Sequence, residues 1–393
     1  MNRRKFIWVA GGGAIAAASV ATVAAGGVWS STFPAGAVQA WEGPVGETDP
    51  RRRALAYAIT APNPHNLQPW QVDLRESGVI TLFTDPTRVL PETDPLGRQI
   101  LIGHGAFLEL LVVALAQQGL AAEVTLWPQG ELPASLKGWD RRPVARIVLR
   151  GGAVADPLFG QILKRRTPKS DFDTARAVSA ADLQTLMASA AAAGLLPGGS
   201  VEPARLPALR ELCWESAKVE LLTPRTMMES IRLTRVGPRE ILKHRDGISL
   251  NSPFIRLADT AGMFDRNAPP AEGSPGYKAA MDRFSGHSRS AMGFAWLSTA
   301  GNSRSEQVRA GRAYVRMQLK ATEMGLGVHP MSQALQEFAE MQPHFERAHQ
   351  LMLGKGAPRS AGDETLQMFV RLGYTKAQVP ATPRRPLAKF VAA

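Results

Sequence analysis

The chain contains a single cysteine, Cys213, in 393 residues. One thiol cannot form an intrachain disulfide, and it cannot supply the cysteine cluster of a structural zinc site. The seven histidines are scattered and form no His-x-x-x-His or His-Glu-x-x-His pattern, so they do not indicate a zinc site. We therefore expect no metal centre. A composition of 45% hydrophobic residues can instead supply large apolar cores.

Several catalytic and nucleotide-binding motifs are also missing. The sequence has no Gly-x-Gly-x-x-Gly motif, no Gly-Lys-Ser/Thr phosphate loop and no serine nucleophile elbow, and we predict no catalytic side chain. The net charge of +12 raises nucleic acid or an anionic membrane as partners. We exclude nucleic acid, because the basic residues are spread along the chain and only four tyrosines are present. Attraction to anionic lipid stays open.

The N-terminus reads as a targeting segment. Arg3 and Arg4 precede Phe6, Ile7 and an apolar run, rich in Ala and Gly, that extends to about Val28. Twin arginines in this setting are typical of a twin-arginine export signal, which the export machinery recognises. The run is also long enough to span a bilayer. We expect residues 1–40 to be this signal or an uncleaved anchor, with the remainder periplasmic or facing outward from the membrane.

The most informative segment is a proline-rich loop that ends at Trp70. Its three prolines exclude a helix interior and a central strand, and Asn66 and Gln68 offer uncharged donors and acceptors. From Pro62 onward it resembles the Pro-x-x-x-Asn-x-Gln-Pro-Trp loop of the nitroreductase family of FMN enzymes. The resemblance implies that FMN is contacted by Pro62, Asn63, Asn66 and Gln68. We expect Leu67 and Trp70 to pack inward.

Three further segments resemble parts of the same family. Residues 165–169, after an apolar segment at 157–163 that we expect to be helical, are similar to the Arg-x-Ser/Thr-x-Lys/Arg element that grips the FMN phosphate and the pyrimidine edge. Residues 382–386 resemble a basic C-terminal segment that reaches the phosphate. Residues 325–333 resemble a Gly-Leu-x-x-x-Pro segment beside flavin N5. The resemblance thus implies further cofactor contacts from Arg165, Arg166, Thr167, Lys169, Pro330, Met331, Ser332, Gln333, Arg384 and Arg385.

The sequence also indicates an internal duplication. Residues 105–120 and 311–326 both begin with Gly, keep helical apolar spacing and end in Gly-Leu, and the same 206-residue offset relates both ends. The overall resemblance is to the twin-arginine-exported, Acg-like branch of the family, in which one chain carries two nitroreductase-like halves. We therefore expect an α+β fold built as an intrachain pseudo-dimer, monomeric in solution, with halves at 41–150 and 151–393.

The two halves differ in ways that bear on function. The first has the Asn/Gln loop, but its basic run Arg51-Arg52-Arg53 lacks a following Thr-x-Lys; the second has residues 165–169 but no second loop. We therefore expect one composite site and one FMN per chain. The second half also carries an insertion at about 195–293, which is either a lid over the flavin or a helical elaboration of the core.

The resemblance implies an FMN-dependent oxidoreductase that passes electrons from NAD(P)H to a quinone, nitroaromatic or similar small-molecule acceptor. Lys169 would then stabilise the anionic reduced flavin. The alternative is a flavin-binding or flavin-sequestering protein with little turnover. Local patterns predict helices at 51–59, 99–118 and 305–324 and strands at 71–75, 79–84, 123–127, 144–149, 294–298 and 368–372.

Overall fold

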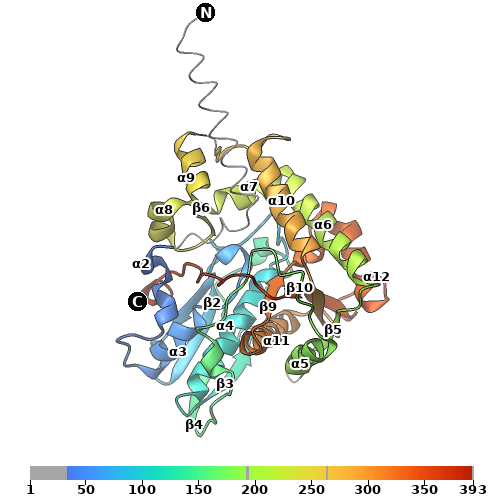
Figure 1. The fold of residues 1–393 in the computed structure, drawn as a ribbon. Helices are drawn as coiled ribbons and strands as arrows, with labels where there is room; N and C mark the ends of the chain where they lie inside the picture. Colours follow the sequence, from blue (N-terminus) through green and yellow to red (C-terminus); the bar gives the residue numbers. More distant parts are fainter. Residues whose placement is uncertain (1–32, 192–193, 263, 392–393) are drawn as a thin grey trace, which may run out of the picture.

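The computed structural model describes residues 33–191, 194–262 and 264–391 (Figure 1). The predicted export signal in residues 1–32 lies outside the described residues. Residues 35–40, which we had assigned to the targeting segment, form part of the folded body, because Ala37 is buried in helix α2 (Ala35–Val38) and Trp41 is buried in the 3-10 turn η1 (Gln39–Glu42).

The first half forms one four-stranded antiparallel sheet with the strand order β1-β2-β4-β3. Helices α3 and α4 pack against each other beside it. The elements are α3 (Pro50–Ala58), η2 (Pro64–Asn66), β1 (Trp70–Asp73), β2 (Val79–Thr84), α4 (Arg98–Ala116), β3 (Leu120–Leu126), η3 (Leu136–Gly138) and β4 (Ala145–Gly151).

The second half repeats this plan. Its sheet has the strand order β5-β8-β10-β9. In both sheets the strands that come first, second, fourth and third in the chain therefore lie side by side in that order. The elements are η4 (Phe159–Gln161), α5 (Ala180–Ala191), β5 (Leu196–Ser200), β8 (Gly293–Thr299), α11 (Arg304–Glu323), β9 (Gly327–Pro330), η5 (Ser332–Leu335), η6 (Ala339–Met341), α12 (Gln342–Leu353), β10 (Thr365–Gly373) and η7 (Leu387–Lys389). Helices together with antiparallel sheets confirm the predicted α+β class.

The chain between the neighbouring strands β5 and β8 forms a separate, mainly helical layer, at the top of Figure 1. It contains one short parallel strand pair, β6 with β7. Its elements are α6 (Leu206–Leu222), α7 (Pro224–Arg232), β6 (Thr234–Val236), α8 (Gly237–His244), β7 (Ile248–Leu250), α9 (Pro253–Thr260) and α10 (Pro275–Arg289).

The two long helices α4 and α11 pack together at the centre of the molecule. Both begin at well-formed N-termini: the Asp94 carboxylate accepts from the backbone N–H groups of Gln99 and Ile100, and Ser303 forms a capping box with Glu306. Among the described helices, α4 alone is long and apolar enough to cross a membrane, but 83% of its apolar window is buried inside the protein. Its apolar surface is therefore covered by the core.

Most predicted elements are present within a few residues of their expected bounds. Leu67 and Trp70 are buried, as expected, and the Trp70 ring stacks on Phe107 with ring centroids 4.9 Å apart. The helix expected over residues 157–163 is wrong, because the segment contains only the 3-10 turn η4. Seven residues with Gly160 at their centre cannot offset the cost of helix nucleation.

Candidate functional site

The loop after α3 has an unusual backbone. His65, Asn66 and Gln68 have positive φ angles of 47°, 53° and 54°, a left-handed conformation that side chains other than glycine rarely adopt. The side chain of Asn63 supports it: Oδ1 accepts from the N–H of Gln68 at 2.8 Å, and Nδ2 donates to the carbonyl of Ala61 at 3.1 Å. Strained residues clustered in one loop are typical of functional sites.

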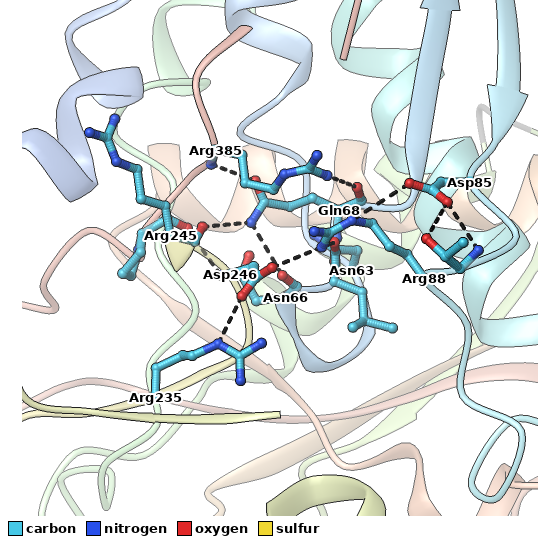
Figure 2. A network of polar contacts seen from close by, with 12 residues as sticks. Asn63, Asn66, Gln68, Asp85, Arg88, Arg235, Arg245, Asp246 and Arg385 are labelled. Atoms are coloured by element: carbon cyan, nitrogen blue, oxygen red, sulfur yellow. Dashed lines mark hydrogen bonds and ion pairs between the residues drawn. The ribbon is translucent and has the colours of Figure 1, made fainter. Parts of the chain in front are cut away.

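The amide side chains of this loop are bonded to protein groups. Gln68 is fully buried; its Nε2 donates to the carbonyl of Arg245 at 2.9 Å, and its Oε1 accepts from the N–H of Arg385 at 2.8 Å (Figure 2). Asn66 donates to the carbonyl of Pro383 at 3.0 Å and accepts from Arg384 at 2.7 Å. Both amides therefore fasten the loop to the C-terminal segment, and Gln68 also fastens it to the inserted layer.

Two buried guanidinium groups converge on the start of the same loop. Arg384 donates to the carbonyls of Ile59, Thr60 and Ala61 at 3.0, 3.0 and 3.1 Å. Arg165 donates to the same Thr60 carbonyl at 2.8 Å. Its remaining partners are Gln318 at 3.1 Å and the Thr167 hydroxyl at 3.3 Å. The structure thus brings residues 165–167 and 384 together, although about 220 positions separate them in the sequence.

Trp41 provides an aromatic surface for this cationic cluster. The guanidinium carbons of Arg165, Arg166 and Arg384 lie 5.5, 4.4 and 5.4 Å from its ring centroid, within the range of cation–π attraction. The indole N–H donates to the carbonyl of Thr382 at 2.8 Å. Trp41 stands outside every sequence motif, so no local pattern marks it for this role.

The cluster carries an uncompensated positive charge. Burial lowers the pKa of Arg165 to about 10, and burial followed by repulsion from Arg165 and Arg166 holds the pKa of Arg384 well below its usual range. Within the described part of the chain, neither Arg165, Arg166 nor Arg384 forms an ion pair with a carboxylate. Buried charges in proteins are normally paired, so this arrangement indicates an anionic ligand.

Lys169 extends the positive region toward the second half. Its residue surface is exposed, yet desolvation, followed by repulsion from Arg283 and Arg384, lowers its pKa to about 8. Nearby, burial and then Lys169 lower the pKa of His65 to about 4. The ammonium forms no ion pair with any carboxylate of the described residues.

The segment after β9 is tied to the same region through Arg371. This buried side chain donates to His329 Nδ1 at 2.9 Å and to the carbonyl of Ser170 at 2.7 Å. In the following residues, Met331 is buried in the core and the Ser332 hydroxyl is bonded to the backbone of Phe369. Pro330 pairs with Val370 at the end of the strand, and Gln333 has a buried Oε1 with no partner among the described residues.

The structure therefore assembles three of the four predicted segments directly, through contacts among residues 60–68, 165–167 and 384–385. It connects the fourth, residues 330–333, through His329 and Arg371. Sequence reasoning missed Trp41, Gln318, Arg283 and Arg371. Arg283 lies in the insertion and Arg371 in a strand, and basic residues in such segments ordinarily face solvent. Only their burial beside Lys169 marks them as part of this region.

Comparison with known proteins finds relatives of this chain that are named as NAD(P)H nitroreductases. Two Mycobacterium tuberculosis proteins named as candidate NAD(P)H nitroreductases are similar to it: one is 28% identical over 86% of this chain and 90% of its own length, and the other, Acg, is 29% identical over 86% and 94%. No family model matches the chain.

Solved structures give weaker similarity. The FMN-dependent nitroreductase NfnB of Mycobacterium smegmatis, solved with NADPH, is 18% identical and covers 59% of this chain and 96% of its own, with a TM-score of 0.36. A nitroreductase-like protein of Bacillus cereus is 14% identical and covers 61% and 97%, with a TM-score of 0.33. These scores carry no weight beside the sequence relatives, which span most of both chains.

Proposed function

We propose, on the premise that this chain is homologous over most of its length to nitroreductases of the Acg kind, that it is an FMN-dependent oxidoreductase using NAD(P)H. The observation that carries the proposal is the cationic cluster on Trp41, made of buried Arg165 and Arg384 and half-buried Arg166, with Lys169 beyond it. A phosphate monoester carries a charge of about −1.5 to −2 at neutral pH. Such a group would compensate the cluster, and the flavin ring would extend toward Lys169.

The residues present fit a bound FMN. The buried Nε of Arg165 has no partner among the described residues and would gain one from a phosphate oxygen. Arg166 and Thr167 follow it in the sequence as further donors, and Lys169 would hold the pyrimidine edge. When bound, FMN supplies the redox chemistry at its own ring, so the protein needs to bind and orient it.

We assign different tasks to the residues of the loop. Asn66 and Gln68 hold Arg384 and the backbone of Arg385 in place, so they act on the ligand as positioning residues. Pro62 and Asn63 are partly exposed and are the loop residues proposed to face the flavin. For residues 330–333, we propose contact through Pro330, Ser332 and Gln333, because the Met331 side chain is occupied in the core.

One FMN per chain is the proposed stoichiometry, with the two halves forming a pseudo-dimer. Two of the three first-half arginines that could have built a second phosphate site are neutralised: Arg51 pairs with Asp49 at 2.8 Å, and Arg52 pairs with Glu47 at 2.6 Å. Paired cations attract an anion far less than unpaired ones. The contrast with the unpaired second-half cluster supports a single composite site.

The physiological acceptor is proposed to be a quinone, a nitroaromatic or a similar small molecule, met after export by the twin-arginine route. The second candidate function is flavin sequestration, and one observation favours it. The inserted layer contacts the loop through Gln68 and Arg245, and His65 Nε2 lies 3.0 Å from the Ser230 hydroxyl. A layer fastened in this way would act as a closed lid and slow exchange.

The test is purification of the full-length protein, quantification of flavin released by denaturation, and anaerobic titration with NADH and NADPH. The proposal expects about one FMN per chain and bleaching of the flavin absorbance by at least one nucleotide. Bound FMN that neither nucleotide bleaches would favour sequestration. A colourless preparation that stays colourless with added FMN would refute both functions.

A further inference from the structure

A basic cavity lies at the C-terminal segment, on residues that the proposed function does not use as ligands. It has a volume of about 410 Å³ and is lined by Arg88, by residues 242–246 at and after the end of α8, and by Arg385, Pro386 and Lys389. Arg384 and Arg385 are adjacent in the chain but serve different places. Arg384 bonds to the Asn66 loop, whereas Arg385 lines this cavity.

The cavity has an excess of positive charge. Its one lining carboxylate, Asp246, is already paired with Arg88 at 2.8 Å and with Arg235 at 3.0 Å (Figure 2). The other charged or titratable lining residues are all basic: Lys243, His244, Arg245, Arg385 and Lys389. Within the described ranges, none of Lys243, Arg245 and Lys389 is ion-paired.

The pKa of Arg385 reflects burial and this excess of positive charge. Burial, followed by repulsion from Arg88, lowers the pKa of Arg385 despite attraction from Asp246 and Asp85. Arg245 is held with a φ of 55°, and Gln68 accepts the Arg385 N–H while donating to the Arg245 carbonyl. The walls of the cavity are therefore held by two partly buried hydrogen bonds to Gln68.

We propose that this cavity binds a ligand through one or more phosphate groups. Guanidinium groups match phosphate oxygens in pairs, and lysine ammonium groups add mobile point charges. The volume lies within the range of ordinary small-ligand sites. Gln68 is hydrogen-bonded to Arg245 and to Arg385, one in each wall of the cavity. A ligand bound here would therefore contact residues that hold the loop carrying Asn66. The inference is independent of the proposed FMN site, which uses other side chains.

Two sources could supply the phosphate: a soluble phosphate ester or an anionic lipid headgroup. The lipid source has local support. Leu242 lines the cavity and is 40% exposed, and a Cβ on Gly36 would lie 3.2 Å from its Cδ1. Gly36, in α2, therefore packs beside Leu242 at the rim of this cavity.

The experiment uses the full-length protein in a neutral detergent. One arm titrates inorganic pyrophosphate by calorimetry, and the other titrates mixed micelles containing phosphatidylglycerol. The test variant is Lys243→Gln with Lys389→Gln, two exposed side chains. The control is Lys137→Gln with Lys376→Gln, which removes the same charge at exposed positions outside the cavity. Bound FMN is quantified in every preparation.

We expect at least a tenfold loss of affinity in the test variant, less than a twofold change in the control, and unchanged FMN content in both. Binding of pyrophosphate identifies the soluble source, and binding of phosphatidylglycerol micelles alone identifies the lipid source. The proposal is overturned if neither probe binds, or if both variants weaken binding equally. Loss of FMN with intact pyrophosphate binding would count against the proposed function and leave this site standing.

Discussion

Gly105 and Gly311 lie against each other where α4 and α11 cross. A Cβ built on Gly105 would overlap the carbonyl oxygen of Val308, and one built on Gly311 would overlap that of Ile102. The contact is reciprocal, since Ile102 and Val308 each stand three residues before the glycine of their own helix. Isologous contacts of this kind arise between the subunits of two-fold dimers. This crossing sets how the two halves approach.

The Gly105→Ala substitution is expected to destabilise the protein by about 1–3 kcal/mol or more, because the helices must separate to admit the methyl group. Chemical denaturation measures the change in the free energy of unfolding. Gly151→Ala is the matched control, since a Cβ there would meet nothing within 4 Å. Equal stability of the two variants would show that the crossing is not closely packed.

FMN affinity is expected to depend on the protonation of Lys169. The pKa of its ammonium is near 8 in the free protein, and a bound anion would raise it again. Affinity should therefore be flat near pH 7 and fall above pH 8, by up to about tenfold per pH unit. Fluorescence titration from pH 7 to 9 measures this. Lys169→Gln should bind weakly and show no fall, and a fall that persists in it would point to another group.

The same lowered pKa has a consequence for stability without ligand. Because the ammonium loses its proton more readily in the folded state than in the unfolded state, stability should rise as the pH increases from about 8 toward the ordinary lysine value. This rise should be absent in Lys169→Gln. Thermal denaturation of the flavin-free protein and of flavin-free Lys169→Gln measures this between about pH 7.5 and 10. That range spans the lowered pKa of Lys169 and the ordinary pKa of lysine.

Asn66→Ala is expected to weaken FMN binding, because it removes the acceptor of Arg384 and the donor to Pro383. Alanine is also strained at the φ of 53° that Asn66 adopts. Asn66→Gly separates the two effects, since glycine tolerates this backbone but lacks the amide. Both variants should lose FMN affinity, and the glycine variant should be the more stable. Retained affinity in both would remove Asn66 from the site.

Gln68→Glu is expected to cost about 1–3 kcal/mol of stability, because a buried carboxylate would face the carbonyls of Asn66 and Arg245 without a donor. Gln350→Glu, at an exposed position on α12, is the matched control and should change little. Denaturant titration of both variants gives the difference. If Gln68→Glu matches its control, the hydrogen bond that Gln68 donates to the Arg245 carbonyl is dispensable.

Much of the architecture could be predicted because its signals are local. The apolar periodicity of residues 99–118 predicts a helix whatever the tertiary surroundings. The glycines at equivalent positions of the two central helices, Gly105 and Gly311, are likewise visible in the sequence. The direction in which a side chain points within a site depends on residues that are distant in the sequence. Gln68 is in a loop that suggested ligand contact, but its amide is bonded to residues 177 and 317 positions away. Trp41 likewise gains its role only from arginines distant in the chain.

The hydrogen bond from the N–H of Arg384 to the carbonyl of Ala37, 2.9 Å long, joins the two ends of the folded chain. The cationic cluster needs both ends, since Trp41 and Arg384 are each part of it. During synthesis the N-terminal portion emerges first, so this cluster stays incomplete until residue 384 has left the ribosome. Loading of the proposed cofactor would therefore follow synthesis of both segments.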